Sequence, residues 1–133
     1  MKSILKDTRK PDIIFDTRTG QINICEYLSS LLGIRDGDVI DILEDNGEYY
    51  IAVKFIQPIG RHEATCHCAN KSGSYLRCYS KKLTQKMADI CNVATEKFSL
   101  FVGEQKEQLG YGTIVPLITK NVILWVQMWI TIP

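Results

Sequence analysis

Hydrophobic and polar residues alternate in a short segment near the start of this chain, and a helical period replaces the alternation after it. Residues 21–24 alternate in the manner of a half-buried strand, and residues 12–16 are predicted as a first strand that the turn at residues 17–20 closes. Four apolar residues then recur at the spacing of one helix face: Leu28, Leu31, Leu32 and Ile34. The pattern therefore predicts two strands followed by a short helix.

Two further strands complete this first unit, which we place at residues 12–56. Residues 39–43 and 49–53 are rich in β-branched and aromatic residues, and the sequence between them contains Asn46-Gly47. An Asn-Gly pair between two such runs is typical of a tight hairpin. Gly33 and Asp36-Gly37 end the preceding helix. The predicted order is strand, strand, helix, strand, strand.

Residues 61–119 are predicted to repeat this order after a break at residues 57–60, which contain a proline and a glycine. Ser80 is a suitable N-cap for a helix at residues 81–92. The apolar side of this helix is Leu83, Met87, Ile90 and Cys91. The strands are expected at residues 63–69, 75–79, 97–102 and 112–119, with a polar loop at residues 103–110.

These patterns predict an α+β, mostly β protein with short helices. An internal ββαββ duplication is one interpretation of the two units, and a chance similarity between short elements is the other. Residues 1–11 are expected to be a flexible arm that ends at Pro11. Residues 120–133 are almost wholly apolar, so they are interpreted either as a last buried strand or as a segment used in oligomerisation.

The first unit resembles the AbrB/MazE/SpoVT type of swapped-hairpin domain, the small DNA-binding fold of bacterial transition-state regulators and antitoxins. The resemblance covers residues 12–54 and rests on Gly20, Ile22-Asn23-Ile24, Leu28, Leu32-Gly33-Ile34, the Gly37-Asp38 turn and the last strand, which ends at Lys54. Such a domain is half of a barrel that needs a second half to cover its apolar face. The resemblance therefore implies a barrel-like pseudo-dimer that acts as a DNA-binding transcriptional regulator or an antitoxin-like module.

Members of this family that bind DNA carry basic residues just after the glycine and inside the short helix. Here those positions are Gln21, Ser29 and Ser30. The departure favours an alternative function, in which the chain keeps the fold as a protein-interaction or assembly module without DNA binding. The expected partners are accordingly DNA, another protein or further copies of this chain.

Charge is unevenly distributed although the net charge is only +1, which by itself argues against strongly electrostatic binding of nucleic acid. Residues 21–53 hold one cation and seven anions, whereas residues 54–97 hold eight cations and three anions. Two sets of candidate nucleic-acid contacts follow. The first is Lys6, Arg9, Lys10, Arg18 and Gln21, and the second is Arg77, Lys81, Lys82 and Lys86. Solvation of an exposed helix face is the ordinary explanation for the lysines of the second set.

Composition excludes several other classes of protein. The chain has 133 residues, of which 45% are hydrophobic, so it is long enough to bury a core. Charges interrupt its first residues, so we expect no export signal, no membrane span and a cytoplasmic location. Five cysteines in such a chain are expected to be reduced thiols.

Metal binding and catalysis have little support in the sequence. The potential ligands are His62, Cys66, His67, Cys68 and Cys78. In an extended strand, however, Cys66 and Cys68 face one side while His67 faces the other, so small buried thiols are the simpler interpretation. His67 is also misplaced as a base for a cysteine nucleophile. We therefore predict no metal, no cofactor and no enzymatic activity.

Overall fold

The computed structural model describes residues 11–54, 63–68, 76–108, 110 and 112–125. The first unit contains β1 (Ile13–Asp16), β2 (Gln21–Ile24), α1 (Glu26–Leu32), β3 (Val39–Asp45) and β4 (Glu48–Lys54). The second unit contains β5 (Ala64–Thr65), β6 (His67–Cys68), β7 (Leu76–Tyr79), α2 (Lys81–Cys91), β8 (Lys97–Val102), β9 (Lys106–Gln108) and β10 (Gly112–Trp125).

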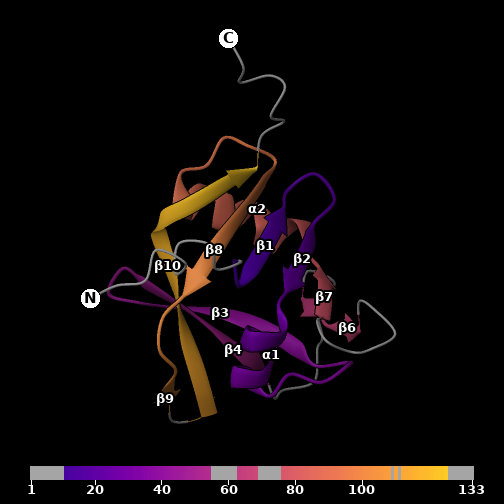
Figure 1. The fold of residues 1–133 in the computed structure, drawn as a ribbon, viewed down its shortest axis with the longest axis vertical. Coiled ribbons are helices and arrows are strands. Elements are labelled where there is room, and N and C mark those ends of the chain that lie inside the picture. Colours follow the sequence, from indigo (N-terminus) through magenta and orange to yellow (C-terminus); the bar gives the residue numbers. More distant parts are fainter. Residues whose placement is uncertain (1–10, 55–62, 69–75, 109, 111, 126–133) are drawn as a thin grey trace, which may run out of the picture.

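Antiparallel pairing joins the strands in the order β5-β3-β4-β10-β8-β1-β2-β7-β6, with β9 beside β10. The strands at the two ends of this order, β5 and β6, follow one another in the chain with only Cys66 between them. The two ends of the sheet therefore meet in one short segment, and the sheet forms a nearly closed barrel (Figure 1). The predicted α+β, mostly β class with short helices is confirmed.

The segment that closes the barrel differs from the single strand expected at residues 63–69. Its first part pairs with β3, where Ala64 lies opposite Ile40, and its second part pairs with β7, where His67 lies opposite Arg77. Cys66 lies at the change of partner, and its backbone exchanges hydrogen bonds with the loop before β3. The strand is divided because its two parts belong to different edges of the sheet.

Side chains that alternate along the strands fill the inside of the barrel. Phe15 on β1 and Phe98 on β8 are fully buried, and their stacked rings have centroids 5.2 Å apart. Ile22 and Ile24 on β2 are fully buried as the alternation predicted. Burying one such side chain stabilises the fold by roughly 1.5–3 kcal/mol. Since the two rings come from different units, the two units share one core.

The first helix begins and ends at residues that satisfy its free backbone groups. Cys25 Sγ accepts a hydrogen bond from the Leu28 N–H at 3.5 Å, and Gly33 ends the helix with a positive φ of 67°. Leu28 and Leu32 are buried, as expected. Ile34 lies beyond the end of the helix, so its assignment to the helix face was wrong. It packs against the core from the loop that follows.

The second helix begins at the predicted N-cap, where Ser80 Oγ accepts the Leu83 N–H at 3.1 Å. It ends one residue earlier than expected because Asn92 adopts the left-handed conformation with a φ of 54°. Its buried side consists of Thr84, Met87 and Ala88. The predicted burial of Met87 is confirmed, but Leu83, Ile90 and Cys91 are only half-buried, because the buried side is rotated toward Thr84 and Ala88.

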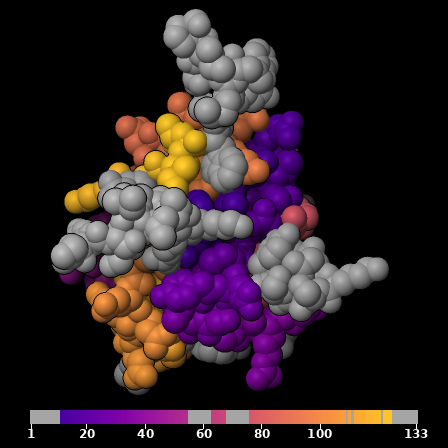
Figure 2. Space-filling view, viewed as in Figure 1, coloured from indigo at the N-terminus to yellow at the C-terminus, as the bar shows by residue number. Residues whose placement is uncertain are grey.

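The end of the chain adds two features that the alternation did not predict. The expected loop at residues 103–110 contains β9, which pairs with the start of β10. β10 continues to Trp125 and pairs with β8 after Pro116. Pro116 thus lies at the change from β9 to β8, an irregular position of the kind that a proline inside a sheet needs. The β9–β10 region, in orange, lies beside the first unit, in indigo and purple, in Figure 2.

The apolar C-terminal region is described as far as residue 125. Ile123 and Leu124 are part of β10, but 36% and 50% of their surfaces are exposed, so the last strand does not bury these two side chains. Residues 126–133 and residues 1–10 of the arm expected at residues 1–11 lie outside the described part of the chain. None of the helices that the structure describes is long and apolar enough to cross a membrane.

Candidate nucleic-acid interface

The turn between β1 and β2 holds Arg18 on a compact, internally bonded loop. The Asp16 carboxylate accepts hydrogen bonds from the backbone N–H groups of Arg18 and Thr19, at 3.0 and 3.4 Å. The Gly20 N–H donates to the Asp16 carbonyl at 2.8 Å. These bonds satisfy the polar backbone of the turn and fix its shape. The Arg18 side chain is therefore presented to solvent from a defined position.

The same turn is attached to two other parts of the barrel. The Thr17 N–H donates to the carbonyl of Glu96, which precedes β8, at 2.8 Å. The Gly20 carbonyl accepts the N–H of Ser80, which precedes α2, also at 2.8 Å. Gly20 has a φ of +81°, and a Cβ atom there would lie 2.8 Å from the Lys81 backbone nitrogen. Only glycine allows this approach. The turn and the first residues of α2 are consequently held together.

The outward side of the β2–β7 pair carries polar side chains next to this turn. Gln21 lies opposite Tyr79, and Asn23 lies opposite Arg77, whose Nε donates to Asn23 Oδ1 at 2.9 Å. About half of the Tyr79 surface, 51%, is exposed. His67 on β6 lies opposite Arg77 on the other side and is exposed. An arginine, two amides, an aromatic ring and an imidazole thus share one face of the sheet.

The first turn of α2 contains two lysines and no acidic residue. Lys81 and Lys82 are exposed there, and Lys86 is exposed one turn later. The N-terminus of a helix carries a partial positive charge, so the helix dipole repels lysine side chains at this position. A bound anion would relieve this repulsion, because backbone N–H groups and lysines would both face it.

The structure brings most of the predicted site residues to one end of the barrel. Arg18, Gln21 and Lys81 surround the turn at Gly20, and Lys82 and Lys86 extend this surface along α2. We call the set Arg18, Arg77, Lys81, Lys82 and Lys86 the basic end. The other predicted contacts, Lys6, Arg9 and Lys10, lie outside the described residues.

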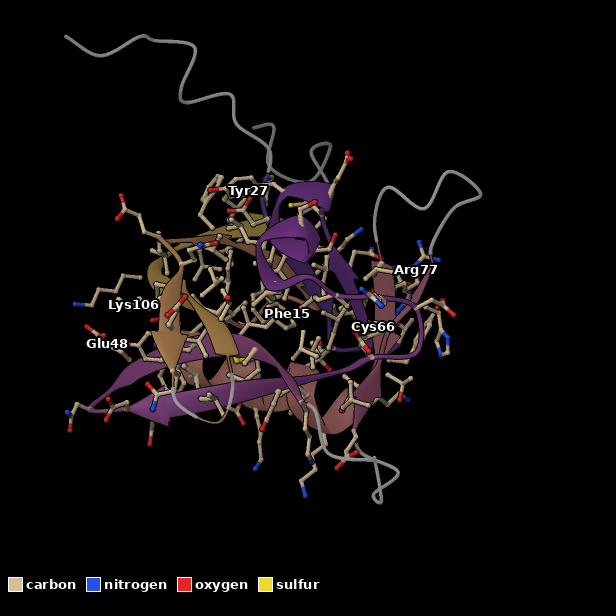
Figure 3. All side chains as sticks on the ribbon, turned by 90° about the horizontal axis from the view of Figure 1, so that it is seen from below. Phe15, Tyr27, Glu48, Cys66, Arg77 and Lys106 are labelled. Carbon is tan, nitrogen blue, oxygen red and sulfur yellow. The ribbon has the colours of Figure 1, made fainter. Side chains whose placement is uncertain are left out.

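The acidic residues described beside the basic end are fewer than its five cations. Arg18 Nε lies 3.9 Å from a Glu96 carboxylate oxygen, and the two side chains are 70% and 71% exposed. An ion pair with this exposure is screened by solvent and salt. Asp89 on α2 accepts a hydrogen bond from Gln85, which leaves the charge of the carboxylate in place. The acidic tip of the β3–β4 hairpin lies away from this surface, as Glu48 and Arg77 show on different sides of Figure 3.

The sequence reasoning missed three residues of this surface, Asn23, Tyr79 and His67. The signal for them was present in the alternation, because Ile22, Ile24 and Cys78 face inward and their neighbours must face outward. What the alternation could not show was the pairing of β2 with β7, which places these neighbours side by side. That pairing joins residues more than fifty positions apart in the chain.

Among the described side chains that suggested a metal site, the Cys66 and Cys78 thiols lie together in the core and His67 faces away from them. Cys66 is fully buried and His67 is exposed, so they face opposite sides as expected. No group of three or more potential ligands is found within the described ranges, and His62 lies outside them. The adjacent Cys66 thiol and burial both raise the pKa of the Cys78 thiol far above its ordinary value. Cys78 is therefore a protonated, unreactive thiol at neutral pH.

A scan against protein-family models gave no match, and searches of curated proteins and of solved structures gave none either.

Proposed function

We propose that this chain is a DNA-binding module of AbrB type, built as a single-chain pseudo-dimer, which holds duplex DNA at its basic end. The observation that carries the proposal is the contact between the β1–β2 turn and the first turn of α2, which gathers Arg18, Lys81 and Lys82. Cations gathered in this way neutralise phosphates, whose contacts supply most of the affinity in sequence-independent binding. Gln21 joins this surface although the family has a basic residue there.

The pattern of strand pairing supports the proposed duplication. In a duplication, β1 is equivalent to the segment that contains β5 and β6, β2 to β7, β3 to β8, and β4 to β10. With these equivalences, the β1–β2 pair corresponds to the β6–β7 pair, the β1–β8 pair to the β5–β3 pair, and the β3–β4 pair to the β8–β10 pair. The β2–β7 and β4–β10 pairs are converted into themselves. Strands of one unit therefore lie between strands of the other, as in a swapped-hairpin dimer. β9 is the exception, because the first unit has no equivalent strand.

One member of the basic end, Arg77, and the two amides beside it have the chemistry of base recognition. Arginine pairs with guanine, and asparagine or glutamine pairs with adenine, in the major groove. Arg77, Asn23 and Gln21 lie together on the outward face of the β2–β7 pair. In the proposed complex the lysines of α2 position the duplex through its phosphates, and these three side chains face the base edges.

Fluorescence anisotropy with a labelled mixed-sequence duplex tests this proposal. Binding should be measurable at about 50 mM salt and should weaken steeply by about 200 mM, with a slope of about −0.9 per phosphate contacted. Arg18→Gln combined with Lys82→Gln should lower affinity by roughly tenfold per lost contact at about 50 mM salt. The matched control is Lys106→Gln on β9, outside the basic end. Absence of binding at low salt, or equal losses in the control, would refute the proposal.

The second candidate is a protein-interaction or assembly module on the same fold, with another protein or further copies of the chain as partner. Two observations favour it: Ser29 and Ser30 replace the basic residues of the family helix, and Ile123 and Leu124 leave apolar surface exposed on β10. The same titration separates the two candidates. We propose a cytoplasmic location for either candidate function. The four cysteines with described side chains are free thiols, which suits a reducing compartment.

A further inference from the structure

A groove of about 570 Å³ crosses the outer side of β3, β4, β10 and β9. Its position is separate from the basic end: Figure 3 shows Lys106 and Glu48 together on one side of the molecule and Arg77 on the other. The volume is within the range of sites that hold small molecules or a few side chains of a peptide. The groove plays no part in the proposed binding of DNA.

The floor of this groove is apolar and does not belong to the barrel core. Tyr50, Ala52 and Ile114 form a separate buried cluster, and Leu43 packs against it from β3. These residues face outward because their neighbours Ile51 and Val115 face the inside of the barrel. An apolar surface of this kind, sunk in a groove, is suited to aliphatic side chains of a partner.

The rim of the groove is acidic. Glu44, Asp45 and Glu107 line it, and Lys106 is the one cation among its described lining residues. Glu44 accepts a hydrogen bond from the Tyr49 hydroxyl at 2.8 Å. Asp45 and Glu107 are exposed and form no ion pair with another described residue. The rim therefore has a net negative charge whose counterpart would be a cationic partner.

Lys106 shows how the groove accommodates a cation. Its Nζ lies over the Tyr50 ring, 5.5 Å from the ring centroid, and the Tyr50 hydroxyl donates to the Glu48 carboxylate at 2.5 Å. A cation over an aromatic face with a carboxylate at the ring's edge is a favourable arrangement for lysine and arginine. Lys106 occupies only the position over Tyr50, and the carboxylates of Asp45 and Glu107 on the rim stay exposed.

We propose that this groove docks a segment of a partner protein in which lysine or arginine residues alternate with aliphatic residues. The aliphatic side chains lie on Leu43, Tyr50 and Ile114, and the cations lie between the rim carboxylates. The partner segment is extended in this arrangement, because successive side chains of an extended chain point to opposite sides, so one set can lie on the floor while the other reaches the rim.

Fluorescence polarisation with a short labelled peptide that alternates lysine and leucine tests the proposal on the full chain. We expect saturable binding that weakens with salt, weaker binding of a lysine–serine peptide and none of a glutamate–leucine peptide. Asp45→Asn combined with Glu107→Gln should lower affinity for the lysine–leucine peptide by about tenfold or more. The matched control is Glu96→Gln before β8, which removes a carboxylate outside the groove and should leave affinity unchanged.

A variant that should bind the peptide more tightly provides a further test, because misfolding could not produce a gain in affinity. Lys106→Glu removes the competing cation from Tyr50 and adds a carboxylate, so affinity for the lysine–leucine peptide should rise several-fold. The proposal is overturned if this variant binds more weakly, or if the neutralised and control variants bind equally well. Tight binding of the glutamate–leucine peptide that persists when Arg18→Gln and Lys82→Gln are both present would also overturn it, because the groove would then be merely apolar. None of these results depends on whether the basic end binds DNA.

Discussion

Lys82 offers a test in which stability and proposed function should change in opposite directions. It follows the N-cap Ser80 and Lys81 in the first turn of α2, where the structure has no acidic residue. A cation in the first turn of a helix opposes the helix dipole by about 0.3–1 kcal/mol at low salt. Lys86 adds a like-charge neighbour four residues later, at a cost of about 0.2–0.5 kcal/mol. Folding alone would favour an acid at this position.

Lys82→Glu reverses each of these effects. The helix dipole then attracts the side chain instead of repelling it, and the repulsion by Lys86 becomes an attraction in the favourable order of Glu before Lys. Because each effect changes sign, both count twice, and the sum is a stabilisation of about 1–3 kcal/mol at low salt, which corresponds to a rise in Tm of roughly 3–15 °C for a domain of this size. The affinity for duplex DNA should fall at the same time, because one cation of the basic end has become an anion.

Thermal unfolding followed by circular dichroism, at low and high salt, measures the first effect, and the anisotropy titration measures the second. Lys86→Glu is the matched control: it makes the same charge change one turn further along α2, where the dipole is weaker. Its gain in stability should be less than half as large. A lower Tm for Lys82→Glu, or a higher Tm with unchanged DNA affinity, would refute the reasoning.

Three further predictions test the packing around the barrel. Gly20→Ala should lower the free energy of unfolding by more than 2 kcal/mol, whereas Gly33→Ala, which also has a positive φ but meets open space, should lower it by only about 1 kcal/mol in urea titrations. Asp12→Ala should lower it by about 1–3 kcal/mol, because the buried carboxylate accepts the Val102 N–H at 2.9 Å, and Asp12→Asn, which keeps an acceptor, should lower it less. Burial raises the pKa of the Cys91 thiol from 9.0 to about 11, so the fold should lose stability as the pH rises between these values, since the unfolded chain ionises first. At pH 8 its alkylation, followed by peptide mass spectrometry, should be roughly a hundredfold slower than in the unfolded chain.

Local signals in the sequence were sufficient for most of the elements. The alternation around Ile22 and Ile24 placed β2, and the oxygen of Ser80 placed the start of α2, because each depends only on residues within a few positions. Asn46-Gly47 likewise marked the β3–β4 hairpin, and both residues have positive φ there. Features of this kind can be recognised without knowledge of any tertiary contact.

Features that depend on distant partners were not predictable in the same way. The strand is interrupted at Cys66 because the residues before it pair with β3 and the residues after it pair with β7. Thr84 and Ala88 face the sheet because their small size suits the space above it, although Ile90 is more hydrophobic. β9 forms because its neighbour β10 is long enough to provide a template. Each outcome needed the positions of strands that lie elsewhere in the chain.

The candidate site shows the same division. Arg18 and the lysines of α2 were recognised as cations, but nothing in the local sequence indicated that Gly20 brings Arg18 against Lys81. That approach depends on one hydrogen bond between the carbonyl of Gly20 and the N–H of Ser80, sixty residues later. Residue types were therefore sufficient to identify candidate nucleic-acid contacts, but the fold was needed to show which of these residues share a surface.

The net charge of +1 was the weakest guide to function, because it sums charges that the barrel keeps apart. Exposed charges interact appreciably only within about 8–10 Å at physiological salt. Asp45 and Glu107 line the groove that also holds Lys106, and Figure 3 shows Lys106 and Arg77 on different sides of the molecule, so these carboxylates do little to cancel the field near Arg77. A phosphate near Lys82 and a cationic peptide near Asp45 would each meet a local field of opposite sign. A nearly neutral chain can thus present two oppositely charged binding surfaces, provided that its fold separates them.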